Sequence, residues 1–196
     1  MSLSRQQFTL LGIFALFLGP VILVVMMRSS WWQYQPAELK NHGYLVQPPA
    51  HLSLAPAAAI DNRWLILYVV DPSCDPECID HVTSLRQIHR ATGRDSSQLA
   101  IVLLGRTRLG PALRSRLESI YPEFQIVTES SSIVLTTLDT VNKAVAAKTG
   151  SSSVLHTYIL DPRLNVVLAY GVNAYPNDIH KDLKRLLKWS DKENTR

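Results

Sequence analysis

The chain has 196 residues, and its 20 Lys and Arg against 16 Asp and Glu give a formal net charge of +4. This length suits one ordinary domain with a short appendage. The charges are interspersed, no block of basic residues alternates with aromatic residues, and there is no glycine-rich phosphate loop. We therefore expect neither a nucleic-acid nor a nucleotide partner.

The N-terminal segment is long and apolar. Residues 6–27 contain no charged side chain, and about 20 apolar residues cross a bilayer core of roughly 30 Å. A cleaved secretory signal is the alternative, but its apolar region usually spans about 7–15 residues and ends in a small-x-small site. Bulky Met26 and Met27 end this run instead. We therefore predict a transmembrane anchor over residues 1–28, which contacts the membrane through residues 6–27.

The next segment, residues 29–62, is rich in proline, alanine and polar residues. We interpret it as a tether that ends in an edge strand, with a short strand near 41–46. Trp64–Val70 follows as an uninterrupted apolar run, which is typical of a central strand buried on both faces. Apolar residues then recur at helical spacing over 77–92 and predict a helix with one buried face.

The second half of the soluble part continues this alternation of strands and helices. Pro111 is expected to open one helix, and Thr136 or Thr137 to cap the next. Turn-forming residues over 161–165 predict an antiparallel hairpin between two strands. The predicted elements are, in order, strand 99–104, helix 111–121, strand 124–127, helix 135–147, strands 156–160 and 166–170, and helix 178–189.

This order predicts an α/β, thioredoxin-like domain over residues 63–196, with a central mixed sheet flanked by helices and one N-terminal transmembrane helix before it. A right-handed crossover would make the first two long strands parallel neighbours, and the hairpin would supply the antiparallel half of the sheet.

The only two cysteines, Cys74 and Cys78, lie between the end of a buried strand and the first turn of a helix. A helix N-terminus favours the thiolate and lowers a thiol pKa, and a spacing of four places both side chains on one helical face. Carboxylates nearby act in the opposite direction and attract a cation; they belong to Asp71, Asp75, Glu77 and Asp80. The pair therefore indicates a metal site or a regulated disulfide, and a stabilising disulfide is the alternative.

The segment from Trp64 to Cys78, a strand followed by Cys-x-x-x-Cys entering a helix, resembles the Sco/SenC family of copper chaperones. In that family the copper ligands are the two cysteines and a histidine just ahead of a later strand, which corresponds to His156 here. The thioredoxin topology would bring the start of the hairpin towards the cysteines. Asp75 and Ile79 stand where the family usually has proline, and Leu155 stands where it has an acidic residue.

The resemblance implies that Cys74, Cys78 and His156 bind copper as Cu(I) or Cu(II) and pass it to the copper A centre of cytochrome c oxidase subunit II. Two soft thiolates and an imidazole suit this metal. Such transfer is ligand exchange, so the protein would be a metallochaperone and not an enzyme. The resemblance also implies a single-pass protein of the bacterial inner membrane with its C-terminal domain in the periplasm.

Two other functions stay open at this point. In a periplasmic thiol–disulfide reductase acting on cysteines of the oxidase subunit, Cys74 would attack a substrate disulfide and Cys78 would resolve the mixed disulfide. In a non-catalytic scaffold, the same pair would form a structural disulfide. Five further histidines are expected at the surface, with His81 close enough to the cysteines to be a secondary ligand; they are His42, His51, His81, His89 and His180.

Overall fold

The computed structural model describes residues 14–22, 25–26, 41–54, 62–128, 132–150 and 154–194. They belong to two compact units, Met1–Lys40 and Asn41–Arg196. In the first unit, residues 14–22 and 25–26 are helical, and apolar side chains such as Phe14 and Leu16 are exposed. The rest of the predicted span 6–27 lies outside the described residues. Among the residues that are described, no helix is both long and apolar enough to cross a membrane.

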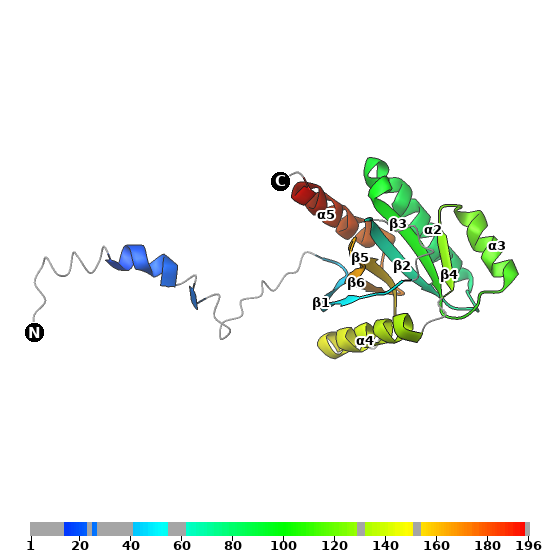
Figure 1. Ribbon diagram of the computed structural model, residues 1–196, viewed down its shortest axis with the longest axis horizontal. Helices are drawn as coiled ribbons and strands as arrows, with labels where there is room; N and C mark the ends of the chain where they lie inside the picture. The colour runs from blue at the N-terminus through cyan, green and yellow to red at the C-terminus, as the bar shows by residue number, and fades with distance from the viewer. Residues whose placement is uncertain are drawn as a thin grey trace, which may run out of the picture. The chain divides into compact units, whose positions relative to one another are not determined.

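The second unit is built on one sheet of six strands, in the order β1-β6-β5-β2-β3-β4 (Figure 1). Strands β2, β3 and β4 run parallel, while β5 pairs antiparallel with both β2 and β6. The elements are β1 (Tyr44–His51), β2 (Trp64–Val70), α2 (Pro76–Ala91), the 3₁₀ helix η1 (Gly93–Gln98), β3 (Leu99–Gly105), α3 (Pro111–Ile120), β4 (Gln125–Thr128), α4 (Ser132–Thr149), β5 (Leu155–Leu160), β6 (Asn165–Gly171) and α5 (Pro176–Asn194).

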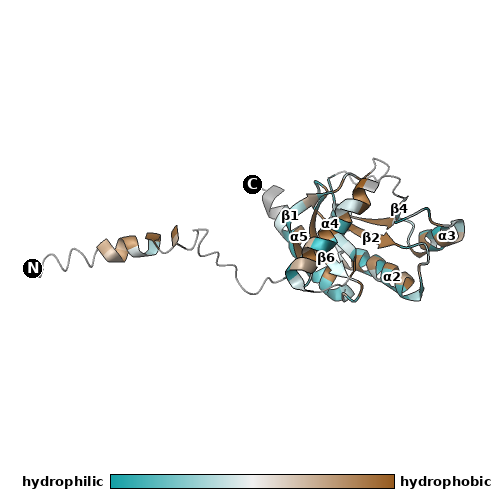
Figure 2. Ribbon diagram, turned by 90° about the horizontal axis from the view of Figure 1, so that it is seen from below, coloured by the Kyte–Doolittle hydropathy of each residue, from teal (hydrophilic) through white to brown (hydrophobic). Residues whose placement is uncertain are grey.

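Helices cover both faces of the sheet. Residues of α2, α3 and α5 pack on one face and residues of α4 on the other, as Figure 1 shows. Every residue of β2 and β3 is buried, because these central strands lie between the two layers. Figure 2 shows the same arrangement by hydropathy, with a hydrophobic β2 at the centre and helix α2 polar along its outer side.

The thioredoxin-like α/β fold predicted from the sequence is therefore confirmed, and most element boundaries agree within one or two residues. The predicted limits are wrong in three elements: α4 begins at Ser132, three residues before the predicted position, β1 spans Tyr44–His51 instead of 41–46, and α5 continues to Asn194, beyond the predicted end at 189. Thr136 and Thr137 do not cap α4, because both hydroxyls donate to the carbonyl oxygen of Ile133 inside the helix. Strand β1 lies in the segment 29–62 that was expected to be a tether with an edge strand, and the compact unit begins at Asn41.

A buried carboxylate holds the entry to β1 against α5. Asp182 is only 2% exposed, and its Oδ2 accepts hydrogen bonds from the backbone N–H groups of His42 at 2.7 Å and Gly43 at 3.0 Å. The hydroxyl of Tyr170 donates to the same oxygen at 3.1 Å. One side chain on the last helix therefore satisfies donors from the segment that enters β1 and from β6.

Replacing Gly43 by alanine is expected to lower the free energy of unfolding by about 1–3 kcal/mol. A Cβ at this position would lie 2.5 Å from Cζ of Tyr170, a ring that the bond to Asp182 holds in place. Urea unfolding measures the loss. Gly110→Ala is the control, because its Cβ meets nothing within 4 Å; as an N-cap change it should cost less than about 1 kcal/mol. Equal losses in both variants would contradict the steric argument.

Three buried tyrosines predict a loss of stability at high pH. Burial raises the pKa of Tyr68 and of Tyr158 from 10.0 to about 12, and burial followed by Asp182 raises the pKa of Tyr170 above its usual range. The unfolded chain releases these protons near pH 10, whereas the folded protein holds them. The stabilisation is therefore complete below pH 10 and is lost as the pH rises, at up to about 1.4 kcal/mol per pH unit for each tyrosine.

Urea unfolding at a series of pH values, with phenolate absorbance as a second signal, measures this loss. Tyr158→Phe should reduce the slope of the free energy of unfolding against pH by the contribution of one tyrosine. Tyr175→Phe should leave this slope unchanged, because Tyr175 is 74% exposed. A stability that stays constant between pH 10 and pH 12 would contradict the burial argument.

Candidate functional site

The two cysteines form a disulfide at the carboxyl end of β2. Cys74 and Cys78 are bonded through their sulfur atoms, with their Cα atoms 5.4 Å apart, and both are half-buried. The loop that holds them is fixed locally: Asp75 is the N-cap of α2 and accepts the backbone N–H of Cys78 at 2.9 Å, and Pro76 follows in the first turn. Cys78 therefore lies in the first helical turn, as predicted.

His156 reaches the same place from the hairpin. β5 lies beside β2, with Thr157 opposite Tyr68. On the other side of β5, the register against β6 shifts: Leu155 pairs with Gly171 and Thr157 with Tyr170. Two residues of β5 therefore oppose one of β6, so His156 is the extra residue of a β-bulge. Bulges re-aim a side chain, and the His156 ring centroid lies 6.3 Å from that of Tyr68.

His81 is the third component of this region, and it comes from the second turn of α2. Its ring stacks on Tyr68 with centroids 4.8 Å apart, and its Nε2 lies 2.9 Å from the hydroxyl of Thr157. Burial, followed by the charge of His156, lowers the pKa of His81 below its usual value. The ring is therefore held in place and favoured in its neutral form.

These side chains line a pocket of about 210 Å³. Cys74, Cys78, His81 and His156 all contribute to its wall, together with Tyr68. Three carboxylates complete the rim, those of Asp71, Asp75 and Glu77. Only one of them is paired with a cation among the described residues, by the bond of 3.1 Å from Nε of Arg106 to Asp71. The pocket thus combines sulfur, imidazole and excess negative charge.

The structure brings together all three residues that the sequence nominated as ligands, but it corrects the expectation for the other histidines. His89 is 9% exposed and His81 is half-buried, so the prediction of a surface position is wrong for both. Both rings flank the apolar stripe of α2 that packs on the sheet, which is the signal that could have shown their burial. His42 and His51 are exposed as expected, although His42 also contacts Asp178 and Asp182, and His180 is half-buried.

The donor types in the pocket fit copper, but the disulfide has to open first. Two thiolates and imidazole nitrogen are soft or borderline ligands that suit Cu(I). With the sulfur atoms bonded to each other, no three His, Cys, Asp or Glu side chains in the described parts of the chain are arranged to hold a metal ion. Reduction would free both sulfur atoms beside His81 and His156.

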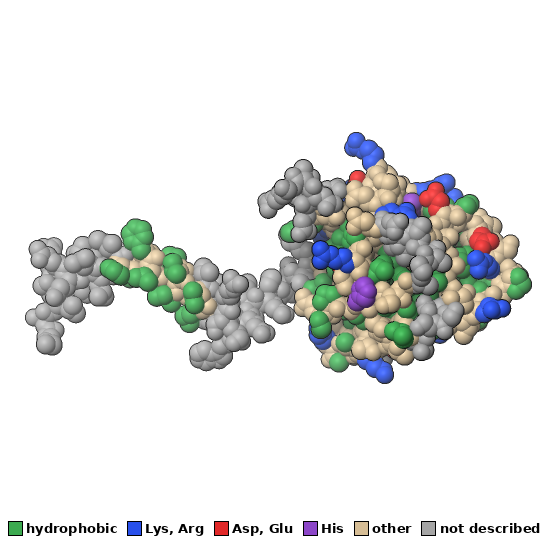
Figure 3. Space-filling view, in the orientation of Figure 1, with side chains coloured by type: hydrophobic (Ala, Val, Ile, Leu, Met, Phe, Trp, Pro, Cys, Tyr) green, Lys and Arg blue, Asp and Glu red, His purple; other side chains and the backbone are tan. Residues whose placement is uncertain are grey.

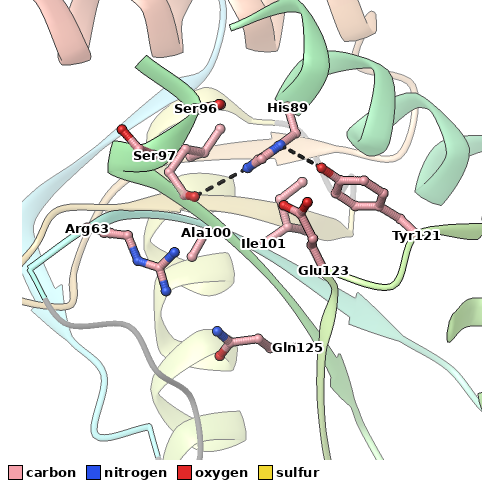
Figure 4. A pocket seen from close by; sticks show the side chains of 10 residues that line it. Arg63, His89, Ser96, Ser97, Ala100, Ile101, Tyr121, Glu123 and Gln125 are labelled. Carbon is pink, nitrogen blue, oxygen red and sulfur yellow. Dashed lines mark hydrogen bonds between the residues drawn. The ribbon is translucent and has the colours of Figure 1, made fainter. Parts of the chain in front are cut away.

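A second pocket lies at the opposite end of the parallel strands, where β3 and β4 begin. It has a volume of about 380 Å³ and contains no cysteine. Figure 4 shows the ring of His89 in its wall with both nitrogens engaged: Nε2 lies 3.4 Å from the carbonyl oxygen of Leu99, and Nδ1 3.1 Å from the hydroxyl of Tyr121. This imidazole therefore serves the packing of α2, whereas both cysteines lie in the other pocket.

A family model described as the transmembrane-like, thioredoxin-like, C-terminal domain matches residues 64–190. The chain belongs to this family. The matched segment runs from the start of β2 into α5, and it therefore contains both cysteines and His156.

Solved structures of Sco proteins share the fold. Apo Sco1 from Thermus thermophilus aligns with a TM-score of 0.53 and 14% identity, over 74% of this chain and 96% of that one. Yeast Sco1 with copper bound aligns with a TM-score of 0.51 and 17% identity, over 71% and 90% of the two chains. The resemblance to the Sco/SenC family is thus confirmed at the level of the fold, with the low identity of a divergent relative. No functionally curated protein matches the sequence.

Proposed function

We propose that this protein is a membrane-anchored, Sco-like copper-binding factor, in which reduced Cys74 and Cys78 and the imidazole of His156 hold the metal. One observation carries the proposal: residues separated by more than seventy positions in the chain line one pocket, and they are the soft sulfur and nitrogen donors that copper prefers. Yeast Sco1, a protein with the same fold, has been solved with copper bound.

The surroundings of the pocket suit the capture and release of a cation. The carboxylates on the rim attract a positive ion without being its strongest ligands. Both cysteines are only half-buried, so an incoming thiolate from a partner protein can replace them one at a time. Copper would therefore be cargo, passed by ligand exchange, and the proposed acceptor is the copper A centre of cytochrome c oxidase subunit II.

The proposed location follows from the sequence and the disulfide together. Residues 6–27 would anchor the chain in the bacterial inner membrane, and the domain from Asn41 onward would lie in the periplasm. Disulfides persist in such oxidising compartments.

On the face seen in Figure 3, Lys and Arg side chains are scattered singly and form no basic patch of the kind that nucleic acids require.

Copper stoichiometry of the full-length protein tests the proposal. The protein is purified in mild detergent, reduced, and loaded with Cu(I) under anaerobic conditions. We expect one tightly held copper per chain, and its loss in Cys74→Ser, because removing one thiolate breaks the soft donor pair. Ser73→Ala, on the neighbouring exposed residue, is the control and should keep one copper. Binding that is absent, or that survives in Cys74→Ser, would overturn the proposal.

A second function is favoured by the half-exposed disulfide itself. In thiol–disulfide exchange, the Cys74 thiolate attacks one sulfur of a substrate disulfide and releases the other as a thiolate, which takes a proton. The Cys78 thiolate then attacks Cys74 and releases the second substrate sulfur. The substrate gains two electrons and two protons, and the Cys74–Cys78 disulfide seen here is the product.

The scaffold alternative is tested by stability. A structural disulfide that closes so short a loop predicts a lower free energy of unfolding for the double variant Cys74→Ser/Cys78→Ser, with assembly of the oxidase unaffected. A stable double variant in cells whose oxidase lacks copper would exclude that alternative.

A further inference from the structure

We propose that His81 is a fourth ligand of the copper site, so that reduced Cys74 and Cys78 bind the metal together with two imidazoles, those of His81 and His156. The inference rests on the proposed function, because it assigns a further residue to the same pocket. The cysteine motif of the sequence contains no signal for it beyond proximity, and the geometry of α2 supplies the argument.

The first step is position. His81 follows Cys78 by three residues on α2, and residues at this interval lie on one face of a helix, while Cys74 lies just before the N-cap Asp75. That face is the one that borders the pocket, since Cys74, Cys78 and His81 all line it. His156 lines the same pocket from β5, so sulfur donors and imidazoles approach the space from two different elements.

The second step is orientation. The ring of His81 is clamped between Tyr68, on which it stacks, and Thr157, whose hydroxyl lies 2.9 Å from Nε2. Thr157 is completely buried, so its hydroxyl has no competing solvent. A neutral imidazole that donates its Nε2 proton to this hydroxyl keeps the Nδ1 lone pair for a metal. Histidines that bind metals commonly donate the other ring N–H in this way, which fixes the tautomer.

The test counts imidazole ligands directly. Full-length reduced protein is loaded with Cu(II), and electron spin-echo modulation from the remote ring nitrogens distinguishes one coordinated imidazole from two. We expect two in the wild type and one in His81→Gln, whose amide can still donate to Thr157 and so keeps the fold. His51→Gln, a change of the exposed histidine on β1, is the matched control and should show two.

Affinity gives a second measurement. Competition with a chromophoric Cu(I) chelator should show weaker binding for Thr157→Val by roughly 10–100-fold, the usual effect of losing an outer-shell partner, with two imidazoles still bound. His81→Gln should weaken binding further. An imidazole count of one in the wild type, unchanged in His81→Gln and lost in His156→Ala, would overturn the inference while the proposed function stands.

A chain that binds no copper at all would instead overturn the proposed function. Binding of Co(II) then tests whether His81 is a metal ligand, because the visible absorption of Co(II) reports the ligand set of a tetrahedral site regardless of copper affinity. A cobalt spectrum that changes in His81→Gln but not in His51→Gln would keep His81 as a metal ligand. An absent or unchanged spectrum would overturn the inference as well.

Discussion

Replacing Asp182 by alanine is expected to lower the free energy of unfolding by about 3–5 kcal/mol, because one buried carboxylate would leave several donors without an acceptor. The N–H of Gly43 and the hydroxyl of Tyr170 are buried, and the N–H of His42 is partly so. Urea unfolding gives the size of the loss. Hydrogen exchange gives its location, and we expect the amide protons of β1 to lose protection first.

Asp178→Ala is the matched control for this experiment. Asp178 lies one turn earlier on α5 and contacts His42 Nε2 at 3.5 Å and Lys181 at 3.2 Å, but it is 26% exposed. Exposed ion pairs contribute about 0–1 kcal/mol, so its removal should have a small effect. Comparable losses in the two variants would contradict the argument that burial makes the Asp182 network important.

His156→Ala is expected to separate copper binding from thiol exchange. Loss of a ligand should weaken Cu(I) binding by more than the roughly 100-fold that loss of an outer-shell partner can cause, because the imidazole contacts the metal directly in the proposed site. The rate of disulfide exchange should stay close to that of the wild type, since the attacking and resolving sulfur atoms belong to Cys74 and Cys78. Chelator competition and reduction of a small disulfide substrate measure the two effects.

His51→Ala, on the exposed edge of β1, controls for the loss of any imidazole. A His156→Ala variant with wild-type copper affinity would show that the assignment of this histidine is wrong. A variant that loses both activities would instead indicate that His156 holds the cysteine loop in shape, which circular dichroism and the melting temperature would then reveal.

The sequence predicted the fold well where burial is continuous. The apolar runs of β2 and β3 are continuous and sharply bounded, and their predicted limits agree with the structure within one residue. The turn-forming residues likewise predicted the hairpin correctly. Oδ1 of Asp161 accepts hydrogen bonds from the N–H groups of Arg163 and Asn165, as expected of an aspartate that initiates a turn.

The same reasoning failed where a polar residue has more than one use. Thr136 and Thr137 were expected to cap a helix, yet a threonine hydroxyl can equally donate to a carbonyl within the preceding turn, and only the extent of α4 decides between these uses. His81 was expected at the surface, although it borders the apolar stripe of α2 and is half-buried. Its partner Thr157 lies 76 residues further on, and no local pattern relates the two.

The position of His156 was predicted, but the feature that determines it was not. An extra residue in β5 can be recognised only against the register of β6. A strand of strict alternation would have given His156 and Thr157 opposite faces. The bulge therefore explains how His156 can line the pocket while Thr157 contacts His81, and it is a property of the pairing that no single strand contains.

The pairing of β1 with β6 has a consequence for biogenesis. β1 is the first strand of the sheet to be synthesised. The hydrogen bond from His42 to Asp182, however, can form only when the chain has grown by a further 140 residues. Until α5 has been made, the edge of β6 is without its neighbour and can pair with other chains. Contacts so distant in sequence form slowly, so the newly made chain stays prone to aggregation until its last helix has been synthesised and has packed.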